Sequence, residues 1–152
     1  MEAREKESAY RAVKIVFTND IMSKVRELLK KSGYSSRAIE YYENHLNVGS
    51  IENPDAHYMF TGPCGVTMEI FLKITSNVIT EAKFQAIGCA GSFTSGSALT
   101  KMITGKTLED CEKLDDNDIL HHLGPMPVQK VHCARLAILT LEKAIEQYNK
   151  KK

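Results

Sequence analysis

The chain has 152 residues, of which 43% are hydrophobic and 26% are charged, a composition typical of a soluble globular protein with one main domain. Its formal net charge of +1 gives no reason to expect nucleic acid or an anionic membrane as a partner. No apolar run approaches the roughly 20 residues that span a bilayer. The first residues mix acids with bases, unlike a secretory signal or a transit peptide, so we expect a cytoplasmic protein.

The N-terminal part of the chain is predicted to be helical. Stretch 9–31 carries apolar residues at helical spacing, although its first half, "AVKIVF", is also compatible with a strand. Gly33 is typical of the position that ends a helix. A second, short helix is predicted for "SSRAIEYYEN" (35–44), with a serine as its N-cap, and a turn-rich loop follows.

Two runs of alternating residues predict a β-hairpin. "TMEIFLKI" (67–74) alternates strictly, and "VITEAKFQAIG" (78–88) continues the pattern after the turn "TSN", with one irregularity that indicates a bulge. "HYMFTG" (57–62) can add an edge strand on the other side. The sequence therefore predicts a small antiparallel sheet of about three strands.

The remainder of the chain is predicted to be helical. Ser92 is the expected N-cap of a helix over 92–104, and "DDNDILHHLG" forms another short helix. Pro127 suits the first turn of a long C-terminal helix that runs to about Tyr148. Strands followed by helices predict an α+β fold in which several helices pack on one face of the sheet.

Three of the four cysteines lie in similar surroundings. Cys64 lies in a Pro/Gly loop before the first long strand, and Cys89 lies in a glycine-rich loop after the second. Because a hairpin returns the chain to its start, these two loops meet at one end of the sheet. Cys133 follows His132 near the start of the last helix, where the helix dipole favours a thiolate. Three thiolates and an imidazole suit zinc or an iron–sulfur cluster better than a disulfide.

The remaining candidates have simpler interpretations. A lone cysteine such as Cys111 is usually a small buried hydrophobic residue. His57, His121 and His122 are more typical of surface or helix-end positions than of metal ligands. The predicted metal or redox site therefore contains none of these four residues.

Several motifs resemble those of a known family. "GPCGVTMEIFLKI", "AIGCAGSFTSGSALTKMITGKTLED" and "PVQKVHCARLAILTLEKAIEQY" are similar, in order and spacing, to the NifU-like, IscU-type scaffold family of iron–sulfur cluster assembly. The resemblance implies a scaffold domain over 33–152 that follows an N-terminal extension, residues 1–32. Such scaffolds are not enzymes with turnover. They accept sulfur from a cysteine desulfurase, bind iron, assemble a [2Fe–2S] cluster and transfer it to apo-proteins.

The resemblance also assigns roles to individual residues. Cys64, Cys89, His132 and Cys133 match the residues that bind the cluster, the iron or, in the isolated protein, zinc. Cys133 further matches the cysteine that accepts the persulfide sulfur. Tyr34 matches a tyrosine that the family carries near its N-terminus.

The chain departs from the family pattern at informative places. Val66 stands where an aspartate usually follows the first cysteine, so we expect a more firmly held and more slowly released cluster. The altered loop "GPMPVQK" argues against recognition by an Hsp-type chaperone. The apolar stripe of extension 1–32 either packs on the domain or contacts a second copy in a homodimer. These departures leave open an alternative: a specialised relative that holds zinc or a stable cluster for storage, regulation or electron transfer.

Overall fold

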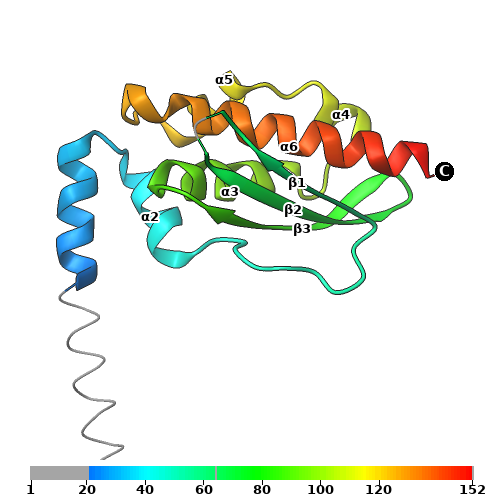
Figure 1. Cartoon of the computed structure of the whole chain (residues 1–152), viewed down its shortest axis with the longest axis horizontal. Helices are drawn as coiled ribbons and strands as arrows, with labels where there is room; N and C mark the ends of the chain where they lie inside the picture. The colour runs from blue at the N-terminus through cyan, green and yellow to red at the C-terminus, as the bar shows by residue number, and fades with distance from the viewer. Residues whose placement is uncertain (1–20, 64, 152) are drawn as a thin grey trace, which may run out of the picture.

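The computed structural model describes residues 21–63 and 65–151 of the chain. The first half of the predicted helix over 9–31 and the candidate ligand Cys64 lie outside the described residues. The described part has an α+β fold, in which helices cover one face of a three-stranded antiparallel sheet (Figure 1). The predicted fold class is therefore confirmed.

The sheet has the strand order β1-β2-β3, with every neighbouring pair antiparallel. Successive side chains of β2 alternate between the core and the outer face, as the period of a half-buried strand requires, and Met68, Ile70, Leu72 and Ile74 all lie in the core. The predicted bulge lies in β3, where Thr80 is the extra residue between two pairs of the ladder, and it keeps both Ile79 and Ala82 in the core. The three strands are β1 (Ala56–Thr61), β2 (Thr67–Thr75) and β3 (Val78–Ile87).

Two long helices form the layer over the inner face of the sheet. Helix α3 packs on β3, α6 packs on β1 and β2, and the two helices contact each other (Figure 1). The approach of α3 to β3 is so close that a Cβ atom at Gly96 would lie 2.4 Å from the ring of Phe84. The helices after the extension are α2 (Ser36–Asn44), α3 (Ala90–Ile103), α4 (Leu108–Glu112), α5 (Asp116–Leu123) and α6 (Val131–Lys150), with a 3₁₀ turn at Val128–Lys130.

Two predicted helix starts were wrong. Pro127 lies before a 3₁₀ turn and not in the first turn of α6, which begins at Val131. Helix α3 begins at Ala90, and Cys89 rather than Ser92 occupies the N-cap position. The Ser92 hydroxyl donates a hydrogen bond of 2.6 Å to the carbonyl oxygen of Cys89, so it lies inside the first turn. A serine in the first turn is thus easily mistaken for a cap when the true N-cap is a cysteine. Cys89 is consequently fixed at the very start of a helix.

The described end of the extension forms a helix over residues 21–32, drawn in blue at the left of Figure 1. It lies beside α2, where both the Nε and Nη2 atoms of Arg26 donate hydrogen bonds to the Glu43 carboxylate, the latter at 2.7 Å. Leu29 packs against the core, whereas Leu28 is 63% exposed. Leu29 of the apolar stripe therefore packs on the domain, which is the first of the two roles predicted for the extension.

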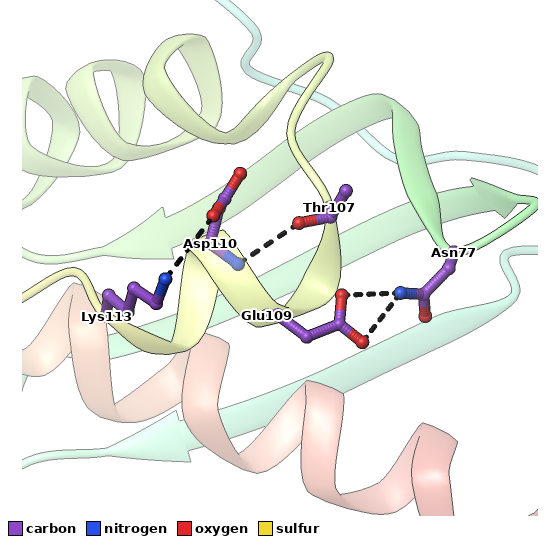
Figure 2. Close-up of polar contacts among 5 residues, drawn as sticks. All are labelled: Asn77, Thr107, Glu109, Asp110 and Lys113. Carbon is purple, nitrogen blue, oxygen red and sulfur yellow. Dashed lines mark hydrogen bonds and ion pairs between the residues drawn. The ribbon is translucent and has the colours of Figure 1, made fainter.

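The turn of the β2–β3 hairpin is attached to the start of α4 (Figure 2). Asn77 Nδ2 donates to both carboxylate oxygens of Glu109, at 2.8 and 2.5 Å. Thr107 caps the helix by accepting a hydrogen bond of 3.2 Å from the backbone N–H of Asp110, whose carboxylate lies 3.8 Å from Lys113 Nζ. The two hydrogen bonds between Asn77 and Glu109 hold the hairpin turn against α4.

Candidate metal centre

The opposite end of the sheet brings two of the predicted ligands together. Thr67 at the start of β2 pairs with Ile87 at the end of β3, so the loops before and after the hairpin lie side by side. The first residues of α6 reach the same place. As a result the Sγ atoms of Cys89 and Cys133 lie 3.8 Å apart, although 44 positions separate them in the sequence.

The distances between the donor atoms suit a shared soft metal ion. Two thiolates bound at about 2.3 Å to one tetrahedral ion lie about 3.8 Å apart, and a thiolate and an imidazole lie about 3.6 Å apart. The Cys89–Cys133 separation is 3.8 Å, and the Nε2 atom of His132 lies 3.7 Å from Cys133 Sγ. In the described part of the chain, however, no three His, Cys, Asp or Glu residues form a group that could hold a metal ion. The predicted set also requires Cys64, which lies outside that part, so the full ligand set stays a prediction.

Adjacent positions of α6 give His132 and Cys133 different environments. Neighbouring residues of a helix point about 100° apart. Cys133 is buried with no exposed surface, whereas His132 is exposed. The imidazole nevertheless turns back toward the buried thiol, within 3.7 Å. Cys133 therefore lies in the core and His132 lies at the surface, and their side chains meet at this end of the sheet.

The environment of Cys89 favours its thiolate. Burial alone opposes ionisation, but the backbone N–H groups of Ser92 and Gly91, the Cys133 thiol and the Lys130 ammonium all stabilise the negative charge. Together they lower the pKa of Cys89 below its ordinary value. The thiolate is the form of cysteine that binds metals and that acts as a nucleophile toward the sulfur of a disulfide or persulfide, so Cys89 is suited to both roles.

Lys130 is a member of the site that the sequence analysis did not identify. A Cβ atom built at Gly91 would lie 3.0 Å from Lys130 Cβ and 3.3 Å from Cys133 Sγ. The absence of a side chain at Gly91 therefore lets the start of α3 approach the start of α6 closely. The sequence does show that Lys130 lies three residues before Cys133. Its place near Cys89, however, results from the packing of α3 on α6 and could not be predicted from the sequence.

Tyr34 is a buried group whose ionisation the two thiols influence. Its side chain is 8% exposed, and its surroundings raise its pKa to about 12. Burial is the main cause, the Cys89 and Cys133 thiols add to it, and a hydrogen bond with the backbone of Gly91 acts in the opposite direction. The phenol is therefore uncharged at neutral pH.

Val66 makes the neighbourhood of Cys89 more apolar. A Cβ atom at Gly88 would lie 2.9 and 3.0 Å from the two methyl groups of Val66, so the valine packs directly over this glycine. The valine is half-buried and contacts the hydrophobic core. The position at which the resemblance implies a carboxylate is thus used for apolar packing.

The residues assigned simpler interpretations lie outside this cluster. Cys111 is 2% exposed, and burial raises its pKa to about 11, as expected of a cysteine that acts as a hydrophobic residue. His122 stacks on Tyr41 and shares a hydrogen bond of 2.9 Å with its hydroxyl group. His57 lies on the outer face of the sheet, 4.0 Å from Glu69.

Comparison with known proteins identifies the family. Residues 33–152 match the family described as the NifU-like N terminal domain. The chain is 38% identical over 119 residues to the iron–sulfur cluster assembly scaffold protein IscU 1 of Archaeoglobus fulgidus, covering 78% of each chain. It is 35% identical over 124 residues to the IscU scaffold protein of Escherichia coli K12, covering 78% of this chain and 96% of the relative. The chain therefore belongs to the NifU-like N-terminal domain family, as its motifs predicted.

A solved structure supports the same fold. The N-terminal part of a nitrogen-fixing NifU-like protein from Brucella abortus superimposes with a TM-score of 0.62 at 20% identity, covering 78% of this chain and 95% of that one. Within the described residues, no helix has both the length and the apolar character needed to cross a membrane.

Proposed function

We propose that this protein is a scaffold on which an iron–sulfur cluster is assembled and from which it is transferred to apo-proteins. The observation that carries the proposal is the 3.8 Å contact between the Cys89 and Cys133 thiols, with His132 beside them, at one end of a NifU-like domain. Relatives at 35–38% identity are named as scaffold proteins of this kind. The protein then acts as a carrier of its cargo and not as an enzyme with turnover.

The proposed chemistry begins with sulfur transfer to Cys133. The partner is a cysteine desulfurase that carries a persulfide on its own cysteine. The Cys133 thiolate attacks the outer sulfur, the sulfur–sulfur bond of the donor breaks, and the desulfurase cysteine leaves as a thiolate. Lys130, whose charge already favours the neighbouring Cys89 thiolate, would stabilise the negative charge that accumulates.

The second step is the assembly of the cargo, a [2Fe–2S] cluster, from two ferrous ions and two transferred sulfur atoms. Reduction of the two persulfide sulfurs to sulfide, which releases the Cys133 thiolate each time, takes four electrons: two come from the oxidation of the ferrous ions to ferric ions and two from an external electron donor. Cys64, Cys89, Cys133 and His132 are the proposed ligands, because thiolates and imidazole suit iron–sulfur clusters and zinc alike. Zinc can therefore occupy the same residues in the isolated protein. Acceptor proteins that lack their cluster are the proposed recipients.

Val66 favours a second candidate function. A carboxylate beside a cluster is a weak, exchangeable ligand that assists both entry of iron and exit of the cluster. Valine cannot coordinate a metal, and here it packs over Gly88 instead. A relative that holds zinc or a stable cluster, for storage, regulation or electron transfer, is the alternative that this packing favours.

Anaerobic reconstitution tests the proposal. Full-length protein is incubated with Fe(II), cysteine, a reductant and a purified cysteine desulfurase, and visible absorption, iron and acid-labile sulfide are measured. Desulfurase-dependent persulfide on Cys133, detected by mass spectrometry, and later transfer of the cluster to an apo-ferredoxin are the expected results. Cys111→Ala is the matched control, because this buried cysteine lies outside the cluster. A protein that takes up zinc alone, or that forms a cluster and never releases it, supports the alternative.

A further inference from the structure

The two thiols that meet at the cysteine end of the sheet are placed to react with each other. The Sγ atoms of Cys89 and Cys133 lie 3.8 Å apart, and both cysteines are free. A disulfide bond is about 2.05 Å long, so the two sulfur atoms have to approach by about 1.8 Å to form one. Rotation of the two side chains about their Cα–Cβ bonds can supply a movement of this size.

The contact between the two thiols is built into the packing of the helices. Cys89 is the N-cap residue of α3, and Cys133 lies in the first turn of α6, so each thiol is carried by the start of a helix. A Cβ atom at Gly91 would lie 3.3 Å from Cys133 Sγ, so the absence of a side chain there lets the two helix starts come together. The pair is therefore held in place by α3 and α6 themselves.

The two cysteines differ in their access to solvent. Cys133 has no exposed surface, whereas Cys89 is only partly buried. The rate at which a thiol reduces a disulfide depends on which of the two sulfur atoms it can reach. In a Cys89–Cys133 disulfide, an external dithiol would therefore attack the sulfur of Cys89 and release Cys133 as the thiolate.

This geometry supplies a chemical step that a persulfide on Cys133 requires. The outer sulfur of a persulfide becomes sulfide only when it gains two electrons. The Cys89 sulfur attacks Cys133 Sγ, the bond between Cys133 Sγ and the outer sulfur breaks, and the outer sulfur leaves as HS⁻ with the proton of the Cys89 thiol. The two cysteine sulfurs lose two electrons as they form the disulfide, and the outer sulfur gains them.

We propose that Cys89 is the resolving thiol of the site, which releases sulfide from a Cys133 persulfide by forming a reversible disulfide with Cys133. The persulfide in this inference rests on the proposed function, whereas the disulfide rests on the contact between the two thiols. The two electrons that cluster assembly takes from an external donor then enter by reduction of the disulfide. The remaining two still come from the ferrous ions.

Oxidation by diamide tests the disulfide without any persulfide. Diamide takes up the two electrons and two protons that a pair of thiols loses. The full-length, metal-free protein is treated with one equivalent, remaining thiols are alkylated, and the unreduced tryptic digest is analysed by mass spectrometry. Trypsin places each cysteine on its own peptide: residues 38–73 (Cys64), 84–101 (Cys89), 107–113 (Cys111) and 131–135 (Cys133).

The main product expected from diamide is peptide 84–101 joined to peptide 131–135, with Cys111 alkylated. Cys111→Ala is the matched control and should give the same product, because this buried cysteine lies outside the cluster. A main product that joins peptide 38–73 to another peptide would overturn the pairing of Cys89 with Cys133. Diamide-treated protein in which both cysteines stay free would overturn it as well.

A single turnover of sulfur transfer tests the release of sulfide. A desulfurase that carries persulfide and has been freed of cysteine is mixed with the metal-free protein, without other thiols. The wild type should release about one HS⁻ for each Cys89–Cys133 disulfide formed. Cys89→Ser should keep the persulfide on Cys133 and release sulfide at least about tenfold more slowly, because a thiol already in contact reacts at a high effective concentration.

The results of this experiment separate the inference from the proposed function. Equal rates of sulfide release from the wild type and Cys89→Ser, or a wild-type persulfide that persists without a disulfide, would overturn the role of Cys89 and leave the scaffold function intact. The linked peptides are measured in the wild type itself, so they decide the matter even if Cys89→Ser fails to fold. A wild type that accepts no sulfur would refute the proposed function and the release step together, and the diamide result would still decide whether the two thiols form a disulfide.

Discussion

The two ends of the three-stranded sheet are built from different kinds of contact. At the hairpin turn, two hydrogen bonds join Asn77 to Glu109 (Figure 2). The Leu108 N–H also donates to the Asn77 carbonyl oxygen at 3.0 Å. At the other end, Cys89 and Cys133 meet through sulfur atoms, and glycines let the backbones come close. At the hairpin turn, the polar groups are paired with other groups of the chain. At the other end, the thiols and the imidazole are soft donors that can bind a metal ion.

The cysteines illustrate why burial alone does not define a reactive thiol. Cys111 is almost completely buried, and Cys89 is half-buried. At Cys111 burial dominates and raises the pKa to about 11, whereas at Cys89 backbone N–H groups and Lys130 outweigh burial and lower the pKa. The neighbours that stabilise negative charge therefore distinguish the site from the core.

The largest expected effect is the loss of metal binding when one thiol of the pair is removed. Cys89→Ala should weaken the binding of zinc at least about 100-fold. Loss of a residue that only hydrogen-bonds to a metal ligand typically costs about 10–100-fold in affinity, and loss of a ligand itself should cost more. Competition with a chromogenic chelator measures the affinity, with Cys111→Ala as the matched control. Equal affinities of these two variants would contradict the assignment of Cys89.

A pH effect on stability is expected from Cys111. Its raised pKa means that the folded state favours the neutral thiol, so its contribution to stability is complete below the unfolded pKa of about 8.5 and is lost as the pH rises toward about 11. Between pH 8 and 11 the free energy of unfolding should fall by about 2 kcal/mol more in the wild type than in Cys111→Ala. Urea unfolding at each pH measures this difference, and parallel pH profiles of the two proteins would refute it.

Restoring the carboxylate at the cysteine end should accelerate release of the cluster. Val66→Asp replaces the methyl groups that pack over Gly88 with an exchangeable ligand. Transfer to an apo-ferredoxin should become about tenfold faster, the order of change expected when the surroundings of metal ligands are altered. Val66→Ala provides the control for lost packing. An unchanged transfer rate in Val66→Asp would reject the link between this valine and slow release.

The smallest expected effect concerns the hairpin turn. Asn77→Ala removes both hydrogen bonds to Glu109 and puts alanine at a φ of 67°, where asparagine is better tolerated. The variant should lose about 1 kcal/mol of stability in thermal unfolding. It should bind zinc as tightly as the wild type, because the turn lies at the far end of the sheet. Weakened zinc binding would show that the two ends are not independent.

Periodicity and turn residues were enough to predict the fold and to place two cysteine loops together. The alternation of β2 and the return of the hairpin put the neighbourhood of Cys64 and Cys89 at one end, because antiparallel geometry leaves no other choice. The first residue of α3 could not be predicted, because Ser92 carries the usual capping signal and Cys89 does not.

The remaining features of the site depend on packing between distant segments. Lys130 lies near Cys89 because α3 and α6 approach each other at Gly91, and no local pattern encodes that approach. The complete burial of Cys133 has the same origin. Sequence motifs therefore predicted the donors, and the structure shows what surrounds Cys89 and Cys133.

X-ray absorption at the zinc edge of the zinc-loaded, full-length protein tests most directly whether these donors share one ion. We expect a first shell of three sulfur atoms at about 2.3 Å and one nitrogen at about 2.0 Å. Cys89→Ala and Cys133→Ala should each remove one sulfur from that shell. A shell of oxygen and nitrogen alone, or one that neither substitution changes, would contradict the account.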